Sequence, residues 1–339
     1  MGFTEHLNHI INLQNLSQDD MASMFMDIFS GNITGAQIGA FMAALATKKE
    51  TFEELAGAAR AMRRKAGRVQ ATSNCVVDTC GTGGDSTGTF NISSTTAFVV
   101  AGCGVTVAKH GNRSVSSKCG SADLLEELGV IIDTEPEIVE EAVNEIGIGF
   151  LFAPRFHGSM RHAAKSRKDV GIRSIFNMLG PLTNPAGAKY QLIGVYAPEL
   201  TEMFAHTLNL LGTEKAFIVH GHDGMDEITT TTLTRLTELD KGVIKTYDID
   251  PLNYFNSYAN PEDIRGGDKK VNKEITKSIL NGAKGTKREI VLINAAAALI
   301  ACKKADELSV GIKMAKDSID TGKANAKLDL LIEFTQDNS

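Results

Sequence analysis

The sequence has no tryptophan, few aromatic residues and no long apolar run. Phe, Tyr and Trp together make up 6% of the 339 residues. No segment approaches the ~18 consecutive apolar residues that a membrane-spanning helix needs. The first residues, Met-Gly-Phe-Thr-Glu-His, lack the basic and apolar regions of a secretory signal peptide. We therefore expect a protein that stays in the cytoplasm and does not bind a membrane.

Cysteine is also sparse, and its spacing does not suggest a disulfide or zinc framework. The five cysteines are an odd number without a Cys-x-x-Cys pair, which favours free thiols in a reducing compartment. Cys80 and Cys119 lie in polar segments where a nucleophile would be plausible. Because no His-Asp partnership is legible beside either one, we interpret both as small filling side chains.

Positive charge does not exceed negative charge. With 35 Lys and Arg against 41 Asp and Glu, the formal net charge is −6, which argues against a broad basic face for nucleic acid. The 42% hydrophobic and 22% charged residues are ordinary for a globular protein. No internal repeat or low-complexity linker is visible. The length suffices for one large domain or two smaller ones.

The first seventy residues are expected to be entirely helical. Three capping-box patterns each precede a stretch with helical apolar spacing, namely Ser17 with Asp20, Thr34 with Gln37 and Thr51 with Glu54. The Met and Phe stripe that follows the first pattern is interpreted as core rather than as a ligand groove.

After Gln70, short apolar runs alternate with helical stretches. The pattern predicts strands at 75–77, 105–108, 148–152, 190–196 and 216–220, and helices at 122–128, 136–146 and 200–211. Such alternation predicts an α/β fold with a central, mostly parallel sheet. Threonine-rich residues near 229–248 suggest added antiparallel strands, and the C-terminal third returns to helix. We expect a small helical domain of residues 1–70 and a larger α/β domain of residues 71–339.

Residues 78–94 form the densest run of glycines, hydroxyls and small polar groups. A predicted strand precedes this run, and residues 93–100 suit a helix capped by hydroxyls. Bare glycine amides and a helix N-terminus together favour a bound phosphate. Gly84 is followed by Asp85-Ser86, so the run is not a Walker A loop, and it lacks the third glycine of a dinucleotide fingerprint.

A second polar segment, Lys109 to Ser114, follows the next predicted strand, and more serines and Lys118 come after it. Ligands of open α/β sheets lie beyond the carboxyl ends of the strands. Two anion-binding loops within forty residues suggest a substrate with more than one phosphate. The alternative is a solvated basic loop.

A third loop carries Asp226 and Glu227 after the predicted strand 216–220. Adjacent carboxylates suit Mg²⁺, which takes oxygen ligands and bridges to substrate phosphates, although such pairs are more often surface charge. His220 and His222 resemble a zinc pair, but no third ligand is evident. We interpret them as residues that order the loop.

The segment 150–173 joins aromatic residues, a proline and a histidine to a basic helix. This composition suits a pocket for a second substrate, with an arginine for a carboxylate. A solvated basic face is the alternative.

Several motifs in these segments resemble the anthranilate phosphoribosyltransferase family, in order along essentially the whole chain. They are Gly81-Thr82-Gly83-Gly84-Asp85, Asn91-Ile92-Ser93-Ser94, Lys109-His110-Gly111-Asn112-Arg113, Gly120-Ser121-Ala122-Asp123, the nine residues from Asn177 to Pro185, and Asp226-Glu227.

The resemblance implies a pentosyltransferase of tryptophan biosynthesis. Such enzymes are Mg²⁺-dependent and transfer phosphoribose from phosphoribosyl pyrophosphate (PRPP) to the amine of anthranilate. The products are N-(5-phosphoribosyl)anthranilate and pyrophosphate. The resemblance also implies a homodimer formed through the helical domain, which would take in a stretch near residues 165–185.

Site residues follow from the matched motifs, and the resemblance implies three groups. For PRPP these are Gly81, Gly84, Asp85, Thr89, Asn91, Ser93, Ser94, Lys109, His110, Gly111, Asn112, Arg113, Ser117 and Ser121. For anthranilate they are Gly81, Asn112 and Arg167, and for Mg²⁺ they are Ser93, Asp226 and Glu227. No catalytic base or nucleophile is expected, and Lys109, Asp226 and Glu227 would contribute most through charge and position.

The chain departs from the family pattern at three places. Ser94 stands where threonine is usual, Gly158-Ser159 replaces Pro-Ala, and Lys168-Asp169 replaces Arg-Glu. Two rival interpretations share the architecture, a pyrimidine nucleoside phosphorylase and a basic nucleic-acid-binding relative. The adjacent acids Asp226 and Glu227 argue against both alternatives. The Lys-His-Gly-Asn-Arg string also argues against the phosphorylase, and the net charge of −6 argues against the nucleic-acid-binding relative.

Overall fold

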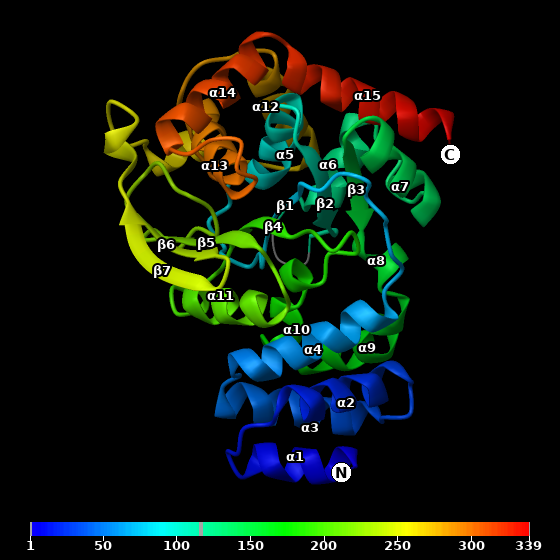
Figure 1. Ribbon diagram of the computed structural model, residues 1–339. Coiled ribbons are helices and arrows are strands. Elements are labelled where there is room, and N and C mark those ends of the chain that lie inside the picture. The colour runs from blue at the N-terminus through cyan, green and yellow to red at the C-terminus, as the bar shows by residue number, and fades with distance from the viewer. Residues whose placement is uncertain (1, 115–117, 339) are drawn as a thin grey trace.

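The computed structural model describes residues 2–114 and 118–338. Figure 1 shows a helical bundle at one end of the molecule, a central sheet, and a layer of C-terminal helices beyond it. Among the described residues, no helix is both long and apolar enough to cross a membrane.

Four helices form the N-terminal bundle, as predicted. They are α1 (Phe3–Ile11), α2 (Gln18–Phe29), α3 (Gly35–Lys48) and α4 (Phe52–Lys65). The three capping residues act as expected, because the side chains of Ser17, Thr34 and Thr51 each accept from the backbone N–H three residues later. The Met and Phe stripe of α2 is buried in the bundle core, which confirms its interpretation as core.

A later segment of the chain returns to this bundle. It comprises α8 (Ala153–Phe156), α9 (Arg161–Val170) and α10 (Ile175–Met178), with short 3₁₀ turns at Gly158–Met160 and Gly180–Leu182. Helix α9 packs against α2 and α3, and the ring centroids of Phe25 and Phe176 lie 5.3 Å apart. Residues far apart in the sequence therefore share one core (Figure 1).

Seven strands form one sheet in the order β3-β2-β1-β4-β5-β6-β7. Strands β1 to β5 pair in parallel and the last two pair antiparallel, which confirms the predicted sheet and its additions. The strands are β1 (Val76–Gly81), β2 (Thr106–Gly111), β3 (Ile148–Phe152), β4 (Tyr190–Gly194), β5 (Lys215–Gly221), β6 (Thr234–Asp240) and β7 (Val243–Ile249).

Helices cover both faces of the sheet. They are α5 (Ile92–Gly102), α6 (Ser121–Leu128), α7 (Pro136–Glu145), α11 (Leu200–Leu210), α12 (Lys269–Leu280), α13 (Thr286–Ala301), α14 (Leu308–Asp320) and α15 (Lys323–Asp337), with 3₁₀ turns at Pro251–Asn253 and Pro261–Ile264. Helix α11 packs on β5 and β6 and also contacts α4, so it joins the sheet to the bundle.

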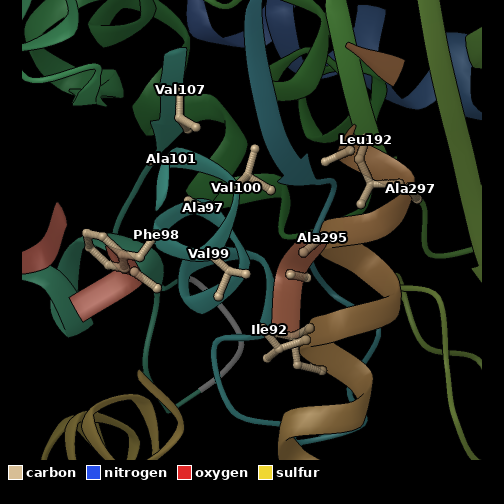
Figure 2. Packing of buried hydrophobic residues seen from close by; sticks show 14 of the residues in the cluster. Ile92, Ala97, Phe98, Val99, Val100, Ala101, Val107, Leu192, Ala295 and Ala297 are labelled. Carbon is tan, nitrogen blue, oxygen red and sulfur yellow. The ribbon is translucent and has the colours of Figure 1, made fainter. Parts of the chain in front are cut away.

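The main core lies under α5. Helix α5 contacts α13, β1 and β2. Figure 2 shows its residues Phe98, Val99 and Val100 in one cluster with Val107, Leu192 and small residues of α13. An apolar helix of this kind, buried on nearly every side, is held firmly in place. The α5 N-terminus is therefore a rigid part of the molecule.

Candidate active site

The sheet order places a topological switch point between β1 and β4. From β1 the chain proceeds outward to β2 and β3, and after β4 it proceeds to β5 on the other side. Ligands of open α/β sheets bind at the carboxyl edge beside such a point. The glycine run follows β1, the Lys-His-Gly-Asn-Arg string spans the end of β2, and Asp226-Glu227 follow β5.

The glycine loop is fastened directly to the acidic pair. The N–H of Gly83 donates to Oδ2 of Asp226 at 2.9 Å. Asp226 comes this close because Gly194 at the end of β4 has no side chain, and a Cβ there would overlap the Asp226 carbonyl oxygen. The two segments, 143 residues apart in the sequence, thus form one surface.

Glu227 lies at the N-terminus of α5. Its Oε1 accepts from the N–H of Ser93 at 3.1 Å, and the residue is buried. The prediction that hydroxyl groups cap this helix is wrong, because the N-cap residue is Asn91 and it makes no side-chain cap bond. A carboxylate from a distant loop takes that role, which is favourable at the positive end of a helix dipole.

Lys109 is buried beside these acids. Its Nζ donates to the carbonyl of Thr79 and lies 3.4 Å from Oγ of Ser93. Burial lowers the pKa of Lys109, while the nearby carboxylates of Asp78 and Glu227 oppose that shift. The ammonium group is therefore held at the strand ends by carbonyl, hydroxyl and acidic neighbours.

The acidic loops repel one another electrostatically. Burial, and next the charge of Asp85, raise the pKa of Asp226 to about 7. Burial and the charge of Asp226 likewise raise the pKa of Glu227 well above its usual range. Buried carboxylates with raised pKa values are stabilised in the charged form by a bound cation.

This donor set fits Mg²⁺. The side chains are hard oxygen donors, two carboxylates and the Ser93 hydroxyl, and one carboxylate oxygen of each acid is already oriented by a backbone N–H. In the part of the chain that the structure describes, no three His, Cys, Asp or Glu side chains converge as a metal cage. Mg²⁺ usually keeps several waters and binds one or two carboxylates together with substrate phosphates.

The second predicted loop is ordered by α6. The carbonyl of Asn112 accepts from Oγ of Ser121 at 3.2 Å, so these two predicted PRPP residues lie together. Arg113 instead forms a two-pronged ion pair with Glu126, at 2.7 and 2.8 Å, and also bonds to Asp123. Its guanidinium is thus engaged by acids of α6. Ser117 lies outside the described residues.

Four other predicted PRPP residues lie between the glycine loop and the first turn of α5, namely Asp85, Thr89, Asn91 and Ser94. Thr89 forms an isolated bridge with Arg265, and Asp85 accepts from Thr87. The Asn91 side chain is held by two bonds, donating to the carbonyl of Cys119 and accepting from Asn272. Oγ of Ser94 is buried and has no hydrogen-bond partner among the described residues, so it is an available donor.

A buried polar network that was not predicted from the sequence supports the second loop. Asp78 accepts from the N–H of His110 at 3.2 Å and from Nδ2 of Asn184 at 2.8 Å. Nδ1 of His110 donates to the Gly180 carbonyl, so its Nε2 accepts from His157 at 3.2 Å. The sequence signals for this network were the two family motifs that contain His110 and Asn184.

Arg167, the predicted anthranilate residue, lies on α9. Its guanidinium stands over the Phe176 ring, with 5.4 Å from Cζ to the centroid. Partial burial lowers its pKa, and among the described residues no carboxylate forms an ion pair with it. A half-buried cation without an acidic partner is suited to a ligand carboxylate. Gly158 faces open space, where an added Cβ would touch nothing within 4 Å.

Other histidines and cysteines have structural surroundings. His220 bonds to the carbonyl of Val195 at 2.8 Å and His222 lies 3.3 Å from Asp248, which agrees with the predicted loop-ordering role. Burial raises the pKa of Cys80 well above its usual range and that of Cys119 to about 11. Thiols in this state are poor nucleophiles, in agreement with their interpretation as filling side chains.

Comparison with known proteins covers nearly the whole chain. Residues 4–66 match the helical bundle domain of the Glycosyl transferase family, and residues 73–325 match its a/b domain. The anthranilate phosphoribosyltransferase of Desulfosudis oleivorans is 63% identical over 337 residues, 99% of each chain. That of Syntrophobacter fumaroxidans is 62% identical over 332 residues, 98% of each chain.

Solved structures agree with these relatives. The anthranilate phosphoribosyltransferase of Thermus thermophilus has a TM-score of 0.92 at 36% identity, covering 97% of this chain and 99% of its own. The Saccharomyces cerevisiae enzyme in complex with PRPP and Mg has a TM-score of 0.91 at 27% identity, covering 99% of this chain and 98% of its own. The chain therefore belongs to the anthranilate phosphoribosyltransferase family.

Proposed function

We propose that this chain transfers the phosphoribosyl group of PRPP to the amino nitrogen of anthranilate, the second step of tryptophan biosynthesis. The bond between ribose C1 and the pyrophosphate oxygen breaks, a bond between C1 and nitrogen forms, and the amine loses a proton. The observation that carries the proposal is the meeting of glycine-loop amides, Lys109 and the adjacent acids Asp226 and Glu227 at the switch point.

The donor site would be built from both anion-binding loops. Glycine-loop amides, the Ser93 and Ser94 hydroxyls and Lys109 would bind the phosphates, with the other PRPP residues named above around them. The Ser94 hydroxyl, buried and without a partner in the described part of the chain, has its hydrogen free for a phosphate oxygen. Electrostatic stabilisation of this kind acts strongly in a site shielded from water.

Asp226 and Glu227, with the Ser93 hydroxyl, would hold the Mg²⁺ ion. The bound ion supplies positive charge that neutralises the departing pyrophosphate. Gly83 and the α5 N-terminus keep the two carboxylates in place through their N–H groups.

The acceptor site would lie where Asn112 and Arg167 face the same substrate, beside Gly81. Arg167 would bind the carboxylate and so orient the ring, while Asn112 bonds near the amine. Because an aromatic amine is already neutral near pH 7, no strong base is required. Positioning and charge stabilisation then provide most of the acceleration.

We also propose the division into two units and their assembly. Residues 1–70 together with about 165–185 would form the helical unit and residues 71–339 the rest, supported by the packing of α9 on α2 and α3. A second copy would bind the helical unit, where the apolar side chains of Ile11 and Leu13 are 56% and 65% exposed. The five free cysteines suit the reducing cytoplasm as its location.

One assay tests the function directly. The loss of anthranilate fluorescence on adding PRPP and Mg²⁺ is followed without tryptophan background, since the chain has none. Wild type should consume anthranilate, and both Asp226→Asn and Glu227→Gln should lose most activity, whereas the exposed Asp306→Asn should not. No consumption by wild type would overturn the function, and full activity in excess EDTA would overturn the metal assignment.

A further inference from the structure

Arg173 connects the helical unit to the glycine loop. It lies in the short connection between α9 and α10, six residues after Arg167. Its Cζ stands 4.3 Å from the centroid of the Tyr196 ring, just beyond the end of β4. Its Nη2 donates to the carbonyl of Gly84 in the glycine loop. The Tyr196 ring thus packs against the planar guanidinium of this exposed arginine, and one of its terminal nitrogens is hydrogen-bonded.

Gly84 is suited to this contact by its backbone. It has a φ of +77°, and a Cβ at this position would lie 3.3 Å from Nη2 of Arg173. The left-handed conformation orients the Gly84 carbonyl differently from that of a strand residue. The preceding residues are bound from the sheet side, since Thr82 N–H donates to Gly194 and Gly83 N–H to Asp226.

The aromatic partner is part of the same arrangement. The N–H of Tyr196 donates to Oγ1 of Thr82 at 3.1 Å, so the ring under Arg173 belongs to a residue that also holds the loop. Arg173, Tyr196 and residues 82–84 therefore form one cluster with contributions from α9–α10, β4 and β1. Arg173 is the member of this cluster that comes from the α9–α10 connection, close in sequence to Arg167.

We infer that Arg173 is a positioning residue that holds the glycine loop in its phosphate-binding shape. The inference rests on the proposed function for its kinetic consequences. The Gly84 carbonyl and the Tyr196 ring fix the orientation of the guanidinium. A glycine-rich loop without this contact has more conformations to lose when PRPP binds.

The test compares Arg173→Ala with three other variants. Arg173→Lys keeps the charge without the planar fork, and Tyr196→Leu removes the ring while leaving the Gly84 bond. Lys168→Ala is the matched control, because it removes a cation from exposed α9 surface. Hydrogen exchange of residues 82–88 is measured without substrates, and KM for PRPP and for anthranilate is measured separately, together with Tm.

We expect Arg173→Ala to speed exchange in 82–88 several-fold and to raise KM for PRPP about tenfold, a loss typical of one charge-assisted bond. Arg173→Lys and Tyr196→Leu should give intermediate values, and Lys168→Ala should match wild type. Unchanged exchange in 82–88 would disprove the inference, as would equal increases in both KM values or a fall in Tm alone. Since exchange needs no turnover, an inactive wild type would count against the function and leave the positioning role measurable.

Discussion

Single residues with buried charge dominate the properties of this site. Lys109 and Glu227 each stabilise the charge of the other, which matters because an isolated buried charge is costly. Arg167 differs, because it is half-buried and its guanidinium lies over the ring of Phe176. Lys109 is thus neutralised by acids of the protein itself, whereas Arg167 is suited to a ligand carboxylate.

Replacing Arg167 with alanine should weaken anthranilate use selectively. A lost charge-assisted bond to the carboxylate costs about 1.5–3 kcal/mol, so KM for anthranilate should rise ~10–100-fold. KM for PRPP should change less than about twofold. Steady-state kinetics with each substrate varied in turn measures both. Equal increases in the two constants would contradict the assigned role, and Arg167→Lys should recover part of the loss.

The buried histidines His110 and His157 should lower the free energy of unfolding in acid. Burial lowers the pKa of His157 to about 3 and also lowers that of His110. The unfolded chain, with a histidine pKa near 6.5, therefore binds more protons than the folded chain below that pH. Stability is full above about pH 6.5 and falls as pH decreases, by ~2 kcal/mol for His157 alone at pH 5.

Denaturant titrations between pH 7 and pH 5 test this. His157→Asn should show a smaller loss of unfolding free energy than wild type, by ~2 kcal/mol. Changing the exposed His206 to asparagine is the control and should leave the wild-type slope. A His157→Asn slope equal to that of wild type would show that this imidazole binds a proton in the folded protein.

At the scale of elements, the helix N-termini show how far local sequence determines a polar contact. The caps of α2, α3 and α4 are local and could be predicted from residues three apart in the sequence. The end of α5 is different, because its carboxylate comes from a loop 134 residues away. Local sequence therefore predicted where helices begin but not which charge completes the end that matters for phosphate binding.

Glu54 is the cap residue with the largest expected effect on stability. It is fully buried and accepts from the N–H groups of Leu16 and Thr51 and from Nζ of Lys48 at 2.9 Å. Glu54→Gln leaves the Lys48 ammonium buried without a counter-charge, so unfolding free energy should fall by ~3 kcal/mol.

Chemical denaturation of Glu54→Gln beside Glu53→Gln provides the measurement. Glu53 is the neighbouring acid of the same helical turn and is only half-buried, so its variant should stay within ~0.5 kcal/mol of wild type. Equal stability of the two variants would mean that the buried pair contributes nothing that a neutral amide cannot supply.

At the scale of the whole molecule, strand order creates the site. Because β1 lies between β2 and β4, the loops after β1, β2 and β5 open onto one edge of the sheet. Helix α9 of the returning segment, which carries Arg167, lies against the bundle (Figure 1), and Arg173 follows this helix in the chain. In the proposed function, the residues for PRPP and for anthranilate therefore come from different units of the fold.

The proposed homodimer is tested at Leu13. Its apolar side chain is 65% exposed to water. Its backbone φ of 59° is also uncommon for a residue other than glycine. Asp tolerates this conformation, so Leu13→Asp together with Ile11→Asp should leave the fold intact and prevent association. Sedimentation should show a dimer for wild type and a monomer for the double variant. Val243→Asp, at a 57% exposed position on β7, is the control and should stay dimeric.

Sequence alone determined much of this protein because the relevant signals are local. Capping boxes and apolar periodicity act within a few residues, so the bundle and the parallel strands were predictable. The family motifs added the substrates and the site residues. Only the tertiary structure decided that Glu227 caps α5, that Asp78 and Asn184 support His110, and that Arg173 binds Gly84. Each of these contacts joins residues more than thirty positions apart, and packing rather than local preference sets which of them meet.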